Sequence, residues 1–255
     1  QRGEQGMFEA LSLKLFNMAG VPTAKTNWLQ FRVIDEVNES GPNQYDSDFW
    51  GLYMTIEQMD GRFLDEHKLP DGNLYKMDQA YEDGAKLNNQ GPTSPTDKSD
   101  ILAFRNNYNS ARSADAWGSI VNLDAYYGLY AIYNAVHHGD ITSKNHFFYQ
   151  NPEPTTNKWG TNSLWWELAW DVDLTWTCYY GGMSDPFSRS GVLNHSEINI
   201  ACKNRVREIV DLLFNPEQTN QLIDEFAAVI DNPDGGLSMV DADRAMWDYN
   251  PVLNP

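Results

Sequence analysis

Three polar residues stand at a spacing that can support chemistry: His138, Asp140 and Asn145, in the segment His-Gly-Asp-Ile-Thr-Ser-Lys-Asn. Phosphoryl transfer requires a carboxylate that orients or accepts a hydroxyl proton, oxygen ligands for a metal ion, and a cation beside the phosphates. The spacing matches the kinase catalytic-loop pattern H-R-D-L-x-x-x-N, with Gly in place of Arg. Three fixed positions also match by chance in many proteins. Taken alone, Asp140 is better explained as a turn residue after a helix.

A pair of carboxylates follows further along the chain. Asp171 and Asp173 come directly after an apolar stretch, residues 164–170, that is typical of a strand. Two carboxylates at a strand end, beside an Asn carbonyl, suit Mg²⁺, because this ion prefers hard oxygen ligands. The alternative for this pair is a surface turn at the end of the strand.

The elements around these residues decide between the two interpretations. Residues 119–137 are densely apolar and aromatic and predict a buried helix that leads directly into His138. Residues 146–149 predict a short strand, and a polar segment, 150–162, separates it from strand 164–170. Kinases have the same order of helix, loop, strand, turn, strand and metal-binding Asp. This order favours phosphoryl transfer over two unrelated turns.

The N-terminal part of the chain has a different pattern. Apolar residues at helical spacing predict a helix from Phe8 to Met18, which ends at Gly20-Val21-Pro22. Residues 28–34 and the alternating stretch 49–57 predict a β-hairpin with a long loop, and residues 74–77 predict a further strand. Residues 83–100 are rich in turn-forming residues and predict a loop or hinge. We therefore expect a β-rich part, 1–100, and a mainly helical part, 101–255, with helices near 203–214 and 216–230.

Several segments together carry a resemblance to a known family. They are Ala19–Pro22, the G-x-Y-x-x-x-E stretch Gly51–Glu57, the G-N-L-Y-K stretch Gly72–Lys76, the loop from His138 to Asn145, and Trp170–Asp173. With these segments the chain resembles the CotH kinase family, the atypical protein kinases related to spore coat protein H. The resemblance covers most of the sequence. It implies an α+β, kinase-like fold with a β-rich N-terminal lobe, which is expected to be incomplete here because the family carries further strands before the first helix.

The resemblance also implies an activity and a set of site residues. It implies a protein kinase that uses ATP with Mg²⁺ or Mn²⁺ to phosphorylate Ser residues of surface or coat proteins, located outside the cell or on a cell or spore surface. Asp140 would be the catalytic carboxylate, and His138 would brace its loop. Asn145, Asp171 and Asp173 would hold the metal. Lys76 would contact the phosphates of ATP, with Glu57 as its ion-pair partner.

Departures from the ordinary kinase pattern leave alternatives open. The chain has no G-x-G-x-x-G-x-V loop, no V-A-I-K and no A-P-E segment, which excludes an ordinary protein kinase. A non-catalytic surface adhesion or binding protein that retains the kinase-like fold is the main alternative. A metal-dependent hydrolase using the same Asp and His residues is a third, which the strand order does not support.

Composition excludes other classes of partner. The 255 residues carry a formal net charge of −18, which repels the phosphate backbone of nucleic acids. No apolar run reaches the length of about 18 residues that a membrane-spanning helix needs. The two cysteines, Cys178 and Cys202, are compatible with one disulfide or with two free thiols.

Overall fold

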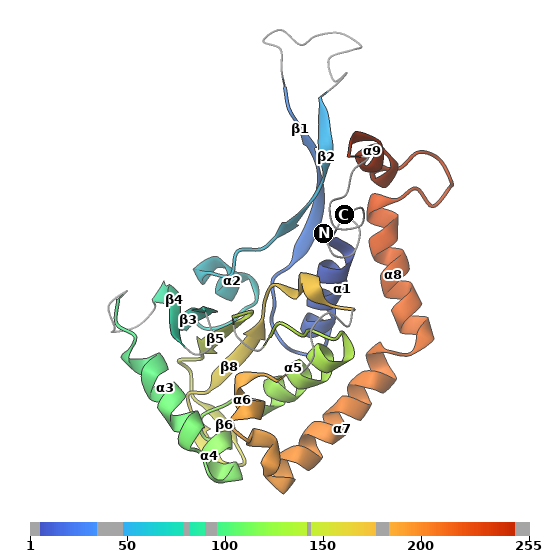
Figure 1. The fold of residues 1–255 in the computed structure, drawn as a ribbon. Coiled ribbons are helices and arrows are strands. Elements are labelled where there is room, and N and C mark those ends of the chain that lie inside the picture. Colours follow the sequence, from blue (N-terminus) through green and yellow to red (C-terminus); the bar gives the residue numbers. More distant parts are fainter. Residues whose placement is uncertain are drawn as a thin grey trace.

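The computed structural model describes residues 6–34, 48–78, 82–89, 96–141, 144–176 and 184–247. Thr142 and Ser143 of the predicted catalytic loop, and Cys178, lie outside these ranges, while Cys202 is buried and free. The fold mixes helices and strands, as expected for an α+β protein (Figure 1). In chain order the elements are α1 (Met7–Met18), β1 (Thr26–Arg32), β2 (Phe49–Ile56), α2 (Gly61–Glu66), β3 (Asn73–Asp78), β4 (Glu82–Asn89), α3 (Ser99–Ser110), α4 (Ala114–Gly118), α5 (Leu123–Ala135), β5 (His146–Gln150), β6 (Thr155–Asn157), β7 (Gly160–Asn162), β8 (Trp165–Ala169), the 3₁₀ turn η2 (Val172–Leu174), α6 (Pro186–Arg189), η3 (Val192–Asn194), α7 (Ser196–Leu213), α8 (Pro216–Ile230) and α9 (Met239–Met246).

A four-stranded antiparallel sheet has the order β4-β3-β5-β8. It corrects one expectation, because residues 82–89 form strand β4 and not part of a loop. The backbone of β4 pairs with β3 in a register that sets Lys86 opposite Tyr75. β4 lies at the edge of the sheet and pairs on one side only, so a polar, Gly- and Asn-containing sequence is tolerated there. The sheet takes two strands from each side of residue 100, and the boundary between two lobes at that position stays a prediction.

Helix α5 forms the centre of the fold. It is buried on nearly every side and packs against α7, β8 and α1, as expected for a helix whose sequence is apolar all round. The helix begins at Asn122, whose side-chain oxygen accepts a hydrogen bond of 3.1 Å from the backbone N–H of Ala125. At Gly128 an added Cβ would lie 2.7 Å from the carbonyl oxygen of Ala19, so only Gly lets the end of α1 approach this closely. The predicted buried helix is confirmed.

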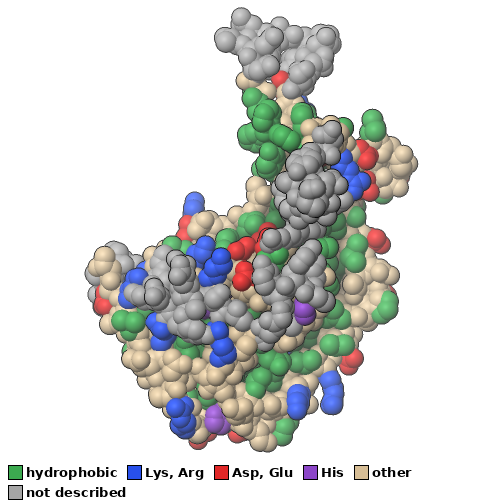
Figure 2. Space-filling model, in the orientation of Figure 1, with side chains coloured by type: hydrophobic (Ala, Val, Ile, Leu, Met, Phe, Trp, Pro, Cys, Tyr) green, Lys and Arg blue, Asp and Glu red, His purple; other side chains and the backbone are tan. Residues whose placement is uncertain are grey.

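Strands β1 and β2 form the predicted antiparallel hairpin, with Thr26 opposite Ile56. The ribbon projects from the body of the molecule, and α9 lies beside it (Figure 1). Asp243 of α9 accepts a hydrogen bond of 2.8 Å from the backbone N–H of Leu52. Hydrophobic side chains gather on the outer part of this ribbon (Figure 2), where Phe31 is 46% exposed.

One hydrophobic core connects the two parts of the chain. It runs from α1 through the sheet and α5 to α7 and α8. The predicted helices near 203–214 and 216–230 are confirmed as α7 and α8, although α7 begins earlier, at Ser196. Within the described ranges, no helix has the length and apolar character required to cross a membrane.

Candidate active site

The predicted catalytic loop begins where α5 ends. His137 takes up a left-handed conformation with φ 61°, and the backbone N–H of His138 donates a hydrogen bond of 2.8 Å to the carbonyl of Tyr133. The chain therefore turns sharply, and the His138 ring becomes fully buried. Burial lowers the pKa of His138 to about 4, and the backbone groups of Asn145 and Trp170 beside the ring oppose this shift. The His138 ring is thus neutral near pH 7 and closed off from solvent.

Asp140 and Asn145 are in direct contact. The Asn145 side-chain amide donates a hydrogen bond of 2.8 Å from Nδ2 to Oδ2 of Asp140. Asn145 is 3% exposed, whereas Asp140 is half-buried. The amide fixes the orientation of the carboxylate that would meet a substrate hydroxyl.

The pairing of two strands of the sheet brings Asp171 close to Asn145. β5 and β8 pair with His146 opposite Ala169, and the backbone N–H of Trp170 donates a hydrogen bond of 3.1 Å to the carbonyl of Asn145. Asp171 follows immediately, in a left-handed conformation with φ 53° and ψ 56°. Asp tolerates this conformation better than most residues, but it still costs on the order of 1 kcal/mol, and such backbone strain is concentrated at functional sites.

The carboxylates of Asp171 and Asp173 hydrogen-bond to each other. Burial raises the pKa of Asp171, Asp173 raises it further, and the positive charges of Lys144 and Lys76 oppose this rise. Two carboxylates this close together are a pair whose charge a divalent cation could neutralise.

The segment after Asp171 is held against α1. The hydroxyls of Thr175 and Ser12 lie 2.9 Å apart, and the indole nitrogen of Trp176 donates a hydrogen bond of 3.0 Å to the same Ser12 oxygen. This contact brings in a residue that the sequence did not single out, Glu9, one turn before Ser12. Burial, followed by the charges of Asp173 and Asp171, raises the pKa of Glu9 to about 7. No local pattern links Glu9 to residues so distant in the sequence.

Lys76 and Glu57 are not brought together. The Lys76 ammonium lies 5.5 Å from the centre of the Trp170 ring, on the side of the site where it also lowers the pKa of Asp171. Glu57 instead accepts hydrogen bonds from the His67 ring, at 3.0 Å, and from the Lys25 backbone, at 2.9 Å.

The predicted Lys76–Glu57 ion pair is therefore corrected: the structure contains no such pair between these two described side chains. The physical reason is that they belong to different sheets. Glu57 follows the β1–β2 ribbon, whereas Lys76 lies on β3 of the four-stranded sheet.

The side chains at this site include oxygen atoms that a metal ion could use as ligands. The described part of the chain contains no group of three or more His, Cys, Asp or Glu side chains that could hold a metal ion by themselves. Mg²⁺ does not require such a cage, because it is usually bound by one or two carboxylates together with phosphate oxygens and water. Asp171, Asp173 and the Asn145 amide fit that smaller donor set.

A family model described as CotH kinase protein matches residues 4–248. The chain belongs to the CotH kinase family. This confirms the family that the sequence motifs suggested, and the CotH match includes every predicted site residue from Glu57 to Asp173. A search of curated proteins gives no match.

Proposed function

We propose that this CotH-family chain is an atypical protein kinase that transfers phosphate from ATP to Ser hydroxyls of surface or coat proteins. One observation supports this function best. The hydrogen-bonded pair Asp140–Asn145 lies beside the Asp171–Asp173 pair, joined to it through the backbone contact between Asn145 and Trp170. A carboxylate for the hydroxyl and a separate oxygen cluster for a cation are the two parts that phosphoryl transfer requires.

Each residue has a distinct proposed role. Asp140 orients the Ser hydroxyl and accepts its proton, and the buried His138 holds the loop in place. Asn145, Asp171 and Asp173 would hold Mg²⁺ or Mn²⁺, which neutralises phosphate charge when bound. Lys76, which is exposed beside the Trp170 ring, would contact a phosphate.

Two further carboxylates complete the proposal. Glu9 adds negative charge beside Asp171 and Asp173, and a bound cation would hold it ionised. Glu57 is assigned a structural role, because its two partners, His67 and the Lys25 backbone, fix the corner between β2 and α2.

The test is a transfer assay with γ-labelled ATP, Mg²⁺ or Mn²⁺, and a Ser-rich peptide paired with the same peptide carrying Ala at every Ser. We expect label only on the Ser peptide. Asp140→Asn should lower the rate by about a thousandfold, since a positioned general base contributes this much. Asp115→Asn, an exposed acid in the first turn of α4, serves as the matched control.

Two outcomes would overturn the proposal. Transfer that survives in Asp140→Asn would remove the proposed role of that residue. A folded protein that shows neither label transfer nor a nucleotide-dependent rise in melting temperature, with either metal, would favour the non-catalytic binding function.

A further inference from the structure

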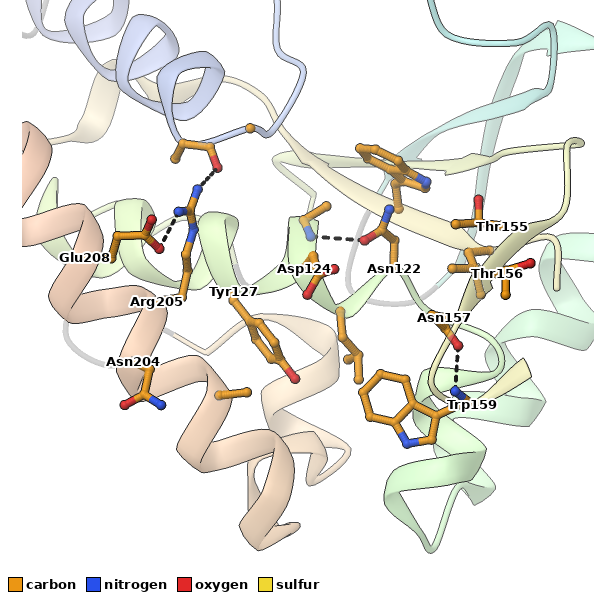
Figure 3. Close-up of a pocket in the computed structure, with 17 residues that line it drawn as sticks. Asn122, Asp124, Tyr127, Thr155, Thr156, Asn157, Trp159, Asn204, Arg205 and Glu208 are labelled. Atoms are coloured by element: carbon orange, nitrogen blue, oxygen red, sulfur yellow. Dashed lines mark hydrogen bonds and ion pairs between the residues drawn. The ribbon is translucent and has the colours of Figure 1, made fainter. Parts of the chain in front are cut away.

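A second site lies at the opposite end of α5 from the catalytic loop. A cavity of about 740 Å³ opens where α5 begins, well inside the size range of small-ligand sites. Its walls come from α5, α7, the β6–β7 hairpin and β8 (Figure 3). The lining residues that matter here are Asp124, Tyr127, Trp159, Trp166, Arg205 and Glu208.

This cavity is separate from the proposed active site. α5 runs from Leu123 to Ala135, and its 13 residues span roughly 20 Å at 1.5 Å per residue. The catalytic loop follows the last turn of the helix, and the cavity adjoins the first. One wall is the β6–β7 hairpin, which is built from the polar segment 150–162 that separates the two strands of the kinase-like pattern. The segment that departs from the kinase order is therefore the one that shapes the cavity.

The hairpin wall is held firmly in place. The Asn157 amide donates a hydrogen bond of 3.0 Å to the carbonyl of Gly118. The Trp159 ring packs directly on the Gly118 backbone, where an added Cβ would lie 2.1 Å from Cδ2 of the ring. Lys158 lies 4.3 Å from the centre of the same ring and pairs with Glu197 of α7, so the hairpin tip is connected to the facing helix.

Two buried polar groups in the cavity wall lack partners. Tyr127 is 5% exposed, and its hydroxyl forms no hydrogen bond with any residue that the structure describes. The indole N–H of Trp166 is likewise buried and unpaired within the described ranges. Each such group costs about 1–3 kcal/mol when left unsatisfied. In Figure 3 the Tyr127 ring extends between α7 and the hairpin, toward the space enclosed by Asp124, Asn204 and Trp159.

The charges around these groups limit the class of ligand. Arg205 is engaged, since it pairs with Glu208 at 2.6 Å and donates a hydrogen bond of 3.0 Å to the carbonyl of Ala19. Asp124 is exposed in the first turn of α5 and offers a carboxylate acceptor. Burial, and then the charge of Asp124, raises the pKa of Tyr127, so its hydroxyl stays protonated and can donate.

Three common kinds of ligand group differ in whether they donate or accept hydrogen bonds. A phosphate accepts hydrogen bonds and cannot satisfy Asp124, which would also repel it. An ammonium or guanidinium donates only and offers no acceptor to the O–H of Tyr127. Hydroxyl groups both donate and accept. A neutral ligand with several hydroxyls on a compact apolar frame is the class that satisfies Asp124 and Tyr127 together.

We propose that this cavity binds a neutral saccharide, with the ring between α7 and the β6–β7 hairpin and its hydroxyls on Asp124 and Tyr127. The proposal goes beyond kinase activity and does not depend on it. An extended peptide, which also carries donors and acceptors, is the competing ligand. The hydroxyl of Tyr127 and the carboxylate of Asp124 distinguish the cavity from a purely apolar groove.

The experiment uses the whole chain and isothermal titration calorimetry. The probes are neutral trisaccharides of glucose, of mannose and of N-acetylglucosamine, together with glucose, glucose 6-phosphate, glucosamine and a neutral Ser-containing peptide. We expect at least one neutral trisaccharide to bind, and glucose 6-phosphate to bind less well than glucose. The proposal is wrong if no neutral saccharide binds with a Kd below about 10 mM, or if the peptide binds and the saccharides do not.

Two variants with matched controls locate the binding. Tyr127→Phe and Asp124→Asn should each weaken saccharide affinity by about tenfold, the effect of one lost hydrogen bond to a well-placed partner. Tyr130→Phe, on the same helix but outside the cavity lining, and Asp115→Asn should leave affinity unchanged. Tyr127→Phe should not lower the melting temperature, because it removes an unpaired buried hydroxyl. Binding that is equal in Tyr127→Phe, Asp124→Asn and the parent chain would overturn the proposed site.

Label transfer to the Ser peptide, measured in parallel, keeps the two proposals apart. Tyr127→Phe should leave this rate unchanged, since its hydroxyl lies at the other end of α5. Loss of saccharide binding with intact transfer supports two independent sites. Loss of both saccharide binding and label transfer in Tyr127→Phe would show that the two sites are not independent.

Discussion

The two ends of α5 differ in how the polar side chains of their proposed sites are satisfied. At the C-terminal end the Asn145 amide donates a hydrogen bond to Asp140, and Asp171 lies against Asp173, although the ring nitrogens of the buried His138 beside them have no side-chain or backbone hydrogen bond within the described residues. At the N-terminal end the Tyr127 hydroxyl and the Trp166 N–H have no partner in the described part of the chain. The first arrangement fixes the orientation of the Asp140 carboxylate before any ligand arrives. The second leaves hydrogen-bonding capacity that no described residue uses.

Asp171→Asn gives the sharpest test of the C-terminal end. Asn retains the shape and tolerates the left-handed backbone, but it removes a charge from the proposed cation site. We expect phosphoryl transfer to fall by about a hundredfold, comparable with the loss of one preorganised electrostatic contact. The melting temperature of the metal-free protein should stay level or rise, because the repulsion from Asp173 is relieved. Loss of activity together with unfolding would instead mean that Asp171 is a structural residue.

Gly118→Ala tests the N-terminal end through its wall. The new Cβ would lie 2.1 Å from the Trp159 ring, so the ring must move. We expect a loss of about 1–3 kcal/mol in unfolding free energy, typical of overpacking, and weaker saccharide binding. The double variant Gly118→Ala, Trp159→Ala should recover stability but not binding. Chemical denaturation and calorimetry measure the two effects, and full recovery of both would show that Trp159 is not part of the site.

Lys76→Met and Glu57→Gln separate two residues that were expected to act as a pair. Lys76 lies beside Asp171, so its loss should lower transfer by about tenfold, the value of one contact to a charged group, and move the acid limb of the pH–rate profile upward. Glu57 hydrogen-bonds to His67 instead, and Glu57→Gln should leave the rate close to that of the parent. Equal losses of transfer rate in both variants would support the Lys76–Glu57 ion pair that the sequence predicted.

A smaller effect is expected from the buried imidazoles next to Asn145. Burial lowers the pKa of His138 to about 4 and that of His146 to about 3, from an ordinary value of 6.5. The unfolded chain takes up these protons first, so stability is complete above pH 6.5 and declines as the pH falls toward 4. Between pH 6.5 and 5.5 each imidazole should cost about 1 kcal/mol of unfolding free energy.

His146→Gln provides the comparison for this pH dependence. The variant should show a shallower decline in urea denaturation over the same pH interval than the parent chain. Slopes that are identical in the two proteins would mean that the pKa of the His146 imidazole is the same in the folded and unfolded chains.

The sequence indicated which residues meet at the C-terminal end of α5, because they are close in the chain or follow paired strands, and their catalytic roles stay predictions. Asp140 and Asn145 lie on one loop, and Asp171 follows the strand that pairs with the strand after Asn145. The helices α1, α5 and α8 and the β1–β2 hairpin were also predicted, since each has a clear apolar period or a terminal signal.

What the sequence missed depends on contacts between distant segments. Glu9 joins the site only because Ser12 bonds to Thr175 and Trp176. Strand β4 was missed because an edge strand needs little apolar periodicity. The Lys76–Glu57 pair was wrong because alternation shows which face a strand residue occupies but not which sheet its strand joins. The cavity at the start of α5 takes its walls from several separate segments, and none of them carries a motif.

The length and rigidity of α5 have a consequence for substrate choice. If the N-terminal end is held by a sugar on a surface, the catalytic loop is confined to within roughly the helix length of that anchor. A Ser that projects from the same surface would then be present at an effective concentration far above its bulk value, whatever its flanking sequence. The choice of substrate would then depend more on its location beside the sugar than on a recognised peptide motif. The length of α5 would set the distance from the sugar within which a Ser can be phosphorylated.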